Sequence, residues 1–286
     1  MTNDLKKHLS NILNENITEF SSVRGGDISK TYKIETFKDS YFLKLNSDPS
    51  AIKMFQAEAY GLECIRKTST VKTPKVLACG TFENYAYLVM DFIESKPPSV
   101  SDFEALGLQL AQLHKNTSKQ FGLDQDNFIG NLPQSNSSRK TWIEFYVQKR
   151  LLPQLDLAKQ KQMLSDRECP NENRIKQILD SLFNNVKPSL IHGDLWSGNY
   201  LISKDGVPYL IDPAIYYGHS EVDIAMSKLF GAFGNSFYEA YGSTLSFDEQ
   251  TKIRIEIYQL YYLLVHLNLF GSTYYNSVKS ILSKFF

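Results

Sequence analysis

Three polar side chains in the second half of the chain have the types and spacing that phosphoryl transfer requires. Asp194 precedes Asn199 by five residues, and Asp212 follows further along. Mg²⁺ binds proteins through one or two carboxylates and other hard oxygens, while nucleotide phosphates supply further ligands. Asn199 and Asp212 offer such oxygens, and Asp194 is suited to accept the proton of an acceptor hydroxyl. This order is that of the kinase catalytic loop, H-x-D-x-x-x-x-N before a metal-binding aspartate. The alternative is a structural polar turn.

The segment between these residues is expected to fold as a hairpin. Residues 200–202 and 208–211 have strand composition, and the Asp-Gly pair between them tolerates positive φ. Because a hairpin folds back on itself, it would return Asp212 to the loop that holds Asn199. The polar residues are therefore expected to share one site.

A lysine and a glutamate in the first third of the chain are expected to form a phosphate-holding ion pair. Residues 41–45 alternate as a strand, with Lys44 on the face opposite the three apolar residues. A helix is expected from Asp48-Pro49 to about Arg66, with Glu58 at the border of its apolar stripe. Kinase folds use such a lysine–glutamate pair to hold the α- and β-phosphates. Without the downstream loop, each residue would be interpreted as a surface charge.

Paired glycines precede this strand. Gly25 and Gly26, followed by Asp27, separate two strand-like runs. Glycine lets backbone N–H groups approach a ligand closely, as a loop that covers phosphates requires. Taken alone, the motif is equally typical of an ordinary hairpin turn.

A proline-rich linker divides the chain. Residues 85–93 have the pattern of the last strand of a first domain, and Pro97-Pro98 stiffens the segment that follows. We therefore expect a nucleotide-binding lobe at 1–93 and a catalytic and acceptor-binding lobe at 94–286. The hinge backbone between them is the expected edge for an adenine ring, at Asp91, Phe92 and Ile93.

Further polar residues flank the catalytic stretch. Asp223 opens a predicted helix, where it would cap the helix or hold the backbone of the catalytic loop. His192, at the start of that loop, is expected to be a second structural anchor. His219 and Glu221 are expected near Asp212 and facing the acceptor. The alternative for this pair is that both are solvated loop residues.

Composition narrows the class of protein. The 286 residues are 42% hydrophobic, which supports the core of one large or two moderate domains. The 31 basic and 31 acidic residues balance, so nothing electrostatic favours nucleic acid or an anionic membrane. Three cysteines without metal-ligand spacing indicate reduced thiols in a cytosolic protein. The first residues lack the apolar core of a signal peptide, and residues 258–270 are too often interrupted to predict a membrane span.

These motifs resemble those of one known family. The sequence is similar to the fructosamine kinases (ketosamine kinases), within the wider superfamily of aminoglycoside phosphotransferases and choline kinases. The resemblance covers nearly the whole chain, and its most specific parts are HGDLWSGN at 192–199 and DPAIYYGH at 212–219. The wider superfamily shares only H-G-D-x-x-x-x-N.

The resemblance implies a fold and a reaction. The fold would be α+β and two-lobed like a protein kinase, with a small antiparallel sheet and one main helix before a larger, mostly helical lobe. The reaction would use ATP and Mg²⁺ to phosphorylate the C3 hydroxyl of ketosamines, which are Amadori adducts of amines or protein lysines. The labile ester then lets the sugar leave, which is deglycation. The preferred sugar and amine and the oligomeric state are left open, and a cytoplasmic location is expected.

The resemblance also assigns roles to residues. Lys44 would hold phosphates, Glu58 would orient Lys44, Asp194 would be the base, and Asn199 and Asp212 would hold Mg²⁺. Trp196 joins His219 and Glu221 on the expected acceptor side. Ser29 stands where many members have Asn, which bears on how the glycine loop covers phosphate.

Two other functions compete with this one. An aminoglycoside or small-alcohol kinase would share the nucleotide site, but such enzymes line the acceptor site with many carboxylates. The segment after Asp212 is instead aromatic, with Glu221 and Asp223 as its acids. A nucleotide-binding pseudokinase would lack catalytic side chains that are intact here.

Overall fold

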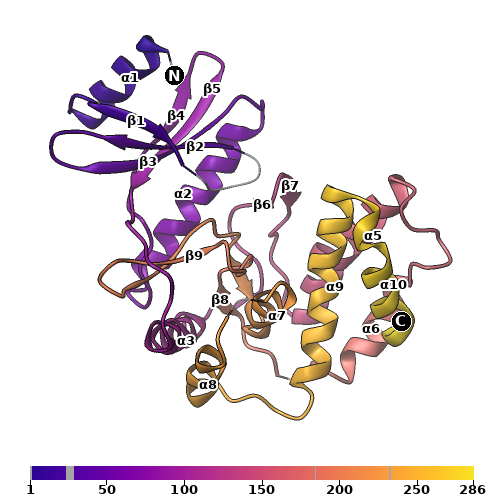
Figure 1. Cartoon of the computed structure of the whole chain (residues 1–286). Coiled ribbons are helices and arrows are strands. Elements are labelled where there is room, and N and C mark those ends of the chain that lie inside the picture. Colours follow the sequence, from indigo (N-terminus) through magenta and orange to yellow (C-terminus); the bar gives the residue numbers. More distant parts are fainter. Residues whose placement is uncertain (1, 24–28, 184, 232) are drawn as a thin grey trace. The chain divides into compact units, whose positions relative to one another are not determined.

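The computed structural model describes residues 2–23, 29–183, 185–231 and 233–286 (Figure 1). The chain forms two compact units. The first unit contains Met1–Asp102 and Gly198–Pro213, and the second contains Phe103–Ser197 and Ala214–Phe286. Each unit is described by itself below. The lobe boundary after residue 93 stays a prediction.

A five-stranded antiparallel sheet is the centre of the first unit. Its order is β1-β2-β3-β5-β4. The strands are β1 Glu19–Ser22, β2 Lys30–Glu35, β3 Ser40–Asn46, β4 Val76–Phe82 and β5 Tyr85–Asp91. Helices α1 Asn3–Leu13 and α2 Ala51–Lys67 cover its two faces (Figure 1). The fold class predicted from the resemblance is confirmed here, with a small antiparallel sheet and one main helix, α2.

The alternation along β3 directs its lysine toward α2. Tyr41, Leu43 and Leu45 belong to the core under α1, while Phe42 packs against the core under α2. Because side chains alternate across a strand, Lys44 shares the α2 face with Phe42. The predicted alternation is confirmed, and it places the positive charge beside the helix that carries Glu58.

Helix α2 begins later than predicted. The expected start was Asp48-Pro49, but the first helical residue is Ala51. The Asp48 carboxylate accepts hydrogen bonds from the backbone N–H of Ser50 at 2.7 Å and from its hydroxyl. The Asp48 carboxylate therefore stabilises a local turn before the helix, as aspartate side chains commonly do, and the helix begins after this turn.

The predicted hairpin belongs to the first unit. β9 Tyr200–Ile202 and β10 Pro208–Leu210 pair antiparallel, and Gly206 in the turn has a φ of 78°. Tyr209 forms an isolated bridge with Lys72, and the N–H of Leu210 donates to the carbonyl of Lys72. The hairpin is therefore joined to the segment before β4.

The second unit is mostly helical. Its helices are α3 Val100–His114 (which begins in the first unit), α4 Trp142–Tyr146, the π-helical turn Val147–Leu151, α5 Leu152–Gln160, α6 Glu172–Asp180, α7 Glu221–Leu229, α8 Asn235–Thr244, α9 Thr251–Phe270, the 3₁₀ turn Ser272–Tyr274 and α10 Tyr275–Phe285. Two short ribbons accompany them, β6 Asn127–Ile129 with β7 Leu132–Gln134, and β8 Ser189–Ile191 with β11 Tyr216–Gly218.

Helix α9 is the core of this second unit. Most of its residues from Ile255 to Leu267 are buried, as the pattern of the late apolar stretch predicted. In the part of the chain that is described, no helix has both the length and the apolar content needed to cross a bilayer.

Candidate active site

The first unit brings together Lys44, Glu58 and Asp212. The Nζ of Lys44 lies 2.8 Å from Oε1 of Glu58, and it also forms an ion pair with Oδ1 of Asp212. Lys44 is only 8% exposed. A buried ammonium is costly unless carboxylates compensate it. Three elements far apart in sequence therefore converge on one positive charge: β3, α2 and the end of the hairpin.

Asp212 has an unusual backbone conformation. Its φ is 52°, in the left-handed region that few residues other than glycine adopt. Aspartate is among the residues that tolerate this region best. The kink follows directly after the hairpin, and the side chain of Asp212 is 29% exposed. Residues in this region persist only where the surrounding structure compensates the strain, and they cluster at ligand sites.

Asn199 lies beside the base of the same hairpin. Its carbonyl accepts a hydrogen bond from the N–H of Ile211 at 3.1 Å, so the residue before Asp212 is tied to Asn199. The side chain of Asn199 is almost fully buried. The first unit thus brings the two predicted metal ligands to one end of the hairpin.

The donor set fits Mg²⁺ that also binds nucleotide phosphates. Among the residues described, no three or more histidines, cysteines or acids cluster as a complete metal site. Mg²⁺ typically takes one or two carboxylates and leaves its other positions to phosphates and water. The charges of Lys44 and Glu58 cancel, so the charge of Asp212 remains to attract a cation. One carboxylate and one amide are therefore a sufficient protein contribution.

In the second unit, a buried carboxylate holds the start of the predicted catalytic loop, residues 192–199. Asp223 accepts hydrogen bonds from the backbone N–H of His192 at 2.7 Å and of Gly193 at 2.8 Å. Its Oδ2 also lies 3.0 Å from Nε2 of His114. Asp223, His192 and the His114 ring are almost completely buried. Each donor compensates the desolvated charge, as buried carboxylates require.

Two further contacts fix the backbone just before Asp194. The carbonyl of Gly193 accepts a hydrogen bond from Oη of Tyr262 at 2.8 Å. Gly193 has a φ of 83°, and a Cβ at this position would collide with the carbonyl oxygen of Ala214. Only glycine fits such a position. The half-buried side chain of Asp194 therefore extends from a rigid loop.

Only some of the other residues predicted to bind the nucleotide belong to the described part of the chain. The backbone N–H groups of Asp91 and Phe92 donate to the carbonyls of Lys75 and Ser40. These two donors are therefore already engaged within the first unit. In the described part of the chain, the backbone of Ile93 makes no hydrogen bond, and its contact with adenine stays a prediction. Gly25, Gly26 and Asp27 lie outside the described residues.

His219 and Glu221 lie at the end of the β8–β11 ribbon opposite the catalytic loop. Gly218 pairs with Ser189, the first residue of β8, whereas the catalytic loop follows Ile191, the last. Glu221 is buried and accepts hydrogen bonds from Nε of Arg254 at 2.7 Å and from the hydroxyl of Thr251 at 3.0 Å. The acceptor role of both residues stays a prediction, as does that of half-buried Trp196.

A group of aromatic rings around His266 of α9 was missed in the sequence. The ring of His266 lies within 5.4 Å, between centroids, of three aromatic rings, and its Nδ1 donates to the carbonyl of Tyr262 at 2.8 Å. Two of these rings are exposed, at 38% and 54%; the three belong to Phe230, Phe270 and Tyr274. Tyr262 precedes His266 by one helical turn and holds the catalytic loop. The only sequence signal was a histidine interrupting an apolar helix.

Replacing Asp223 by alanine tests the anchor. Three buried donors would lose their acceptor, so we expect Asp223→Ala to lower the free energy of unfolding by about 3–5 kcal/mol. Urea denaturation followed by circular dichroism measures the change. Asp180→Ala, at an exposed helix end, is the matched control and should change stability by less than about 0.5 kcal/mol. Equal losses in the two variants would contradict the anchoring role.

Comparison with known proteins agrees with these features. The family model described as fructosamine kinase matches residues 1–286. A probable ketoamine kinase of Lactiplantibacillus plantarum is 41% identical over 271 residues, which are 94% of this chain and 95% of that protein. A chloroplastic protein-ribulosamine 3-kinase of Arabidopsis thaliana is 40% identical, covering 94% and 83% of the two chains.

Solved structures give the same result. A putative fructosamine-3-kinase from Thermobifida fusca superposes with a TM-score of 0.86 at 30% identity, covering 99% of this chain and 98% of the other. A thermostable mutant of the aminoglycoside phosphotransferase APH(4)-Ia superposes with a TM-score of 0.62 at 16% identity, covering 98% of each chain, which is a likeness of fold alone. The full-length match and the two relatives near 40% identity establish that this chain belongs to the fructosamine kinase family.

Proposed function

We propose that this protein transfers the γ-phosphate of ATP to the C3 hydroxyl of a ketosamine, carried by a small amine or by a protein lysine. The family is one of ATP-dependent phosphotransferases that act on a hydroxyl. The observation that supports this proposal most strongly is the ion-pair cluster of Lys44, Glu58 and Asp212, because it joins the predicted phosphate-binding and metal-binding groups.

In this proposal, residues of the first unit bind ATP. Lys44 binds the α- and β-phosphates, and Glu58 keeps its ammonium group oriented toward them. The backbone of Ile93, which makes no hydrogen bond to another described residue, meets the adenine ring. Asn199 and Asp212 would hold Mg²⁺, which neutralises charge on the phosphates when it is bound.

The acceptor half of the reaction uses Asp194. Its carboxylate accepts a hydrogen bond from the acceptor hydroxyl and takes its proton as the new bond forms between that oxygen and the γ-phosphorus. The bond from that phosphorus to the bridging oxygen breaks, and ADP leaves. The hydrogen bonds of Asp223 and Tyr262 to the adjoining backbone hold Asp194 in place. They therefore reduce the entropic cost of orienting the acceptor hydroxyl.

We also propose that the aromatic group around His266 receives the amine end of the ketosamine. Burial lowers the pKa of His266, and its Nδ1–H donates to a carbonyl, so its Nε2 is a hydrogen-bond acceptor. A ketosamine carries a secondary ammonium and several hydroxyls, which are donors. The neighbouring rings of Phe230, Phe270 and Tyr274 favour an ammonium through cation–π attraction.

A cytoplasmic location is part of the proposal. It rests on the cysteine pattern. The Arabidopsis relative is chloroplastic, so relatives do not share one compartment.

A substrate panel tests the function. Incubation with Mg-ATP and ribulosyl-lysine or fructosyl-lysine should give a sugar 3-phosphate, which ³¹P NMR detects before the ester breaks down. Hygromycin B is the comparison acceptor for an aminoglycoside kinase. Turnover of hygromycin B without turnover of either ketosamine would refute the proposal.

The variant Asp194→Asn tests the base. The amide cannot take the proton, so kcat should fall by about 10²–10⁴-fold. Affinity for ATP, measured by calorimetry, should stay within about twofold, because Asp194 contacts the acceptor in this mechanism. A loss of ATP binding with unchanged kcat would show that its role is wrong.

The variant Lys44→Met keeps the length of the side chain and removes its charge. We expect kcat/KM for ATP to fall by about 10²–10³-fold, the range seen when one preorganised electrostatic group is lost. Lys38→Met, on an exposed turn outside the cluster, is the matched control. Similar kinetics in the two variants would exclude Lys44 from phosphate binding.

The variants His266→Ala and Phe270→Ala test the acceptor group. Each should raise KM for a ketosamine by about tenfold, because one hydrogen bond or cation–π contact contributes about 1–2 kcal/mol. KM for ATP should not change. A rise in KM for ATP alone would show that these residues do not bind the acceptor.

A further inference from the structure

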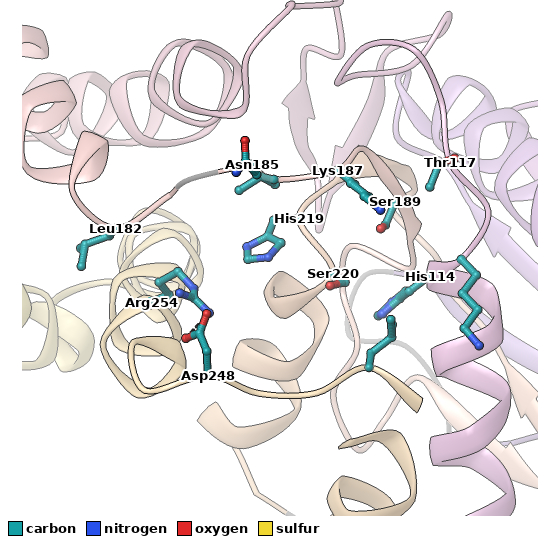
Figure 2. A pocket seen from close by; sticks show the side chains of 13 residues that line it. His114, Thr117, Leu182, Asn185, Lys187, Ser189, His219, Ser220, Asp248 and Arg254 are labelled. Atoms are coloured by element: carbon teal, nitrogen blue, oxygen red, sulfur yellow. Dashed lines mark hydrogen bonds and ion pairs between the residues drawn. The ribbon is translucent and has the colours of Figure 1, made fainter. Parts of the chain in front are cut away.

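The second unit contains a cavity of about 330 Å³ that the proposed reaction does not use. It is lined by the end of α3, residues that follow α6, the start of β8, the segment before α7, the segment between α8 and α9, and the N-terminal part of α9 (Figure 2). Its volume is at the lower end of the range for small-molecule sites, about 300–1,000 Å³. A small metabolite therefore fits it.

The cavity lies at the other end of the β8–β11 ribbon from the catalytic loop, and its lining residue His114 contacts Asp223, the anchor of that loop. Ser189 begins β8 and lines the cavity, whereas the catalytic loop follows Ile191 at the other end of the strand. His219, which also lines the cavity, follows β11 at the same end as Ser189. The cavity and Asp194 are therefore at opposite ends of the β8–β11 ribbon.

A chain of hydrogen bonds fixes the tautomer of His219. The indole Nε1–H of Trp142 donates to Oη of Tyr258 at 2.8 Å. The one proton of the Tyr258 hydroxyl is then available for Nδ1 of His219, which lies 2.7 Å away. Burial lowers the pKa of His219 to about 4, so the ring is neutral near pH 7. Its proton is on Nε2, which has no partner in the described structure and is a donor.

Arg254 supplies further donors. Its Nε and Nη2 bind Glu221, and Nη2 also binds Asp248 at 2.9 Å. Within the described residues, Nη1 makes no hydrogen bond. Figure 2 shows Arg254 and Asp248 together on one side of the cavity, near His219. The two carboxylates fix the guanidinium group and leave its remaining donors for a ligand.

The other charged residues make the cavity basic. Lys115 and Lys187 line it, and neither forms an ion pair with a described residue. Asp248 is the only acid among the described lining residues, and it shares Arg254 with Glu221, so these three groups together carry one negative charge. The two lysines therefore leave the region of the cavity with a net charge of +1. Donors without acceptors and this positive charge are complementary to an anion.

We propose that this cavity binds a small organic anion. Its phosphate or carboxylate group accepts hydrogen bonds from Nε2 of His219 and Nη1 of Arg254, and Lys115 and Lys187 balance its charge. The hydroxyl of Ser189, which also lines the cavity, can bind the polar remainder of the ligand.

Two tryptophans give a direct readout of occupancy. Trp142 is joined to His219 through Tyr258, and Trp196 is on the catalytic loop; the chain has no other tryptophan. In a ¹⁵N-labelled full chain, each indole N–H gives one cross-peak, and Trp196→Phe assigns the pair. Inorganic phosphate and malonate are titrated separately at constant ionic strength, with glycerol as the uncharged probe.

We expect a saturable shift of the Trp142 cross-peak with at least one anion and none with glycerol. The phosphate and malonate arms show which anionic group the cavity prefers. Lys187→Gln should weaken binding about tenfold, because it removes one of the two ammonium groups that balance the charge of the anion. Lys140→Gln, which removes an exposed lysine outside the cavity, should leave the affinity unchanged.

Three results would overturn the proposal. One is the absence of a saturable shift at Trp142 with either anion. Another is an equal loss of affinity in the two lysine variants. The third is a shift confined to Trp196, which would indicate that the anions bind at the catalytic loop instead.

Discussion

The burial of one ammonium group organises the first unit. Lys44 is tolerable inside the protein because Glu58 and Asp212 compensate its charge. This requirement fixes the face of β3 that meets α2, the register of α2 and the end point of the β9–β10 hairpin. The same arrangement leaves one carboxylate in excess beside Asn199, which suits a cation that carries phosphates. Stability and the proposed chemistry therefore depend on the same contacts.

In the second unit, the buried charge is negative and belongs to Asp223. Asp223 has no lysine or arginine partner among the described residues and is compensated by backbone amides and His114. The carboxylate of Asp223 thus fixes the backbone of the loop. Asp194 therefore extends from a main chain with little conformational freedom. Tyr262 completes this support, and it links the loop to α9, where His266 and its aromatic neighbours lie one turn further on.

The sequence predicted those features that depend on local pattern. The period-two alternation of residues 41–45 placed Lys44 correctly, and the Asp-Gly turn predicted the hairpin. Features that depend on tertiary packing were not predictable. The ion pair of Glu221 and Arg254 joins residues on α7 and α9, and nothing in either segment identifies the partner. The cavity and the aromatic group around His266 likewise combine side chains from separate elements.

The central claim is that Asp212 shares its charge between Lys44 and the cation that accompanies ATP. The most direct test measures the affinity for ATP by calorimetry, with and without Mg²⁺, in the unaltered protein and in Asp212→Ala. If Asp212 has this role, Mg²⁺ strengthens ATP binding in the unaltered protein and has no such effect in the variant. The same strengthening by Mg²⁺ in both proteins would contradict it.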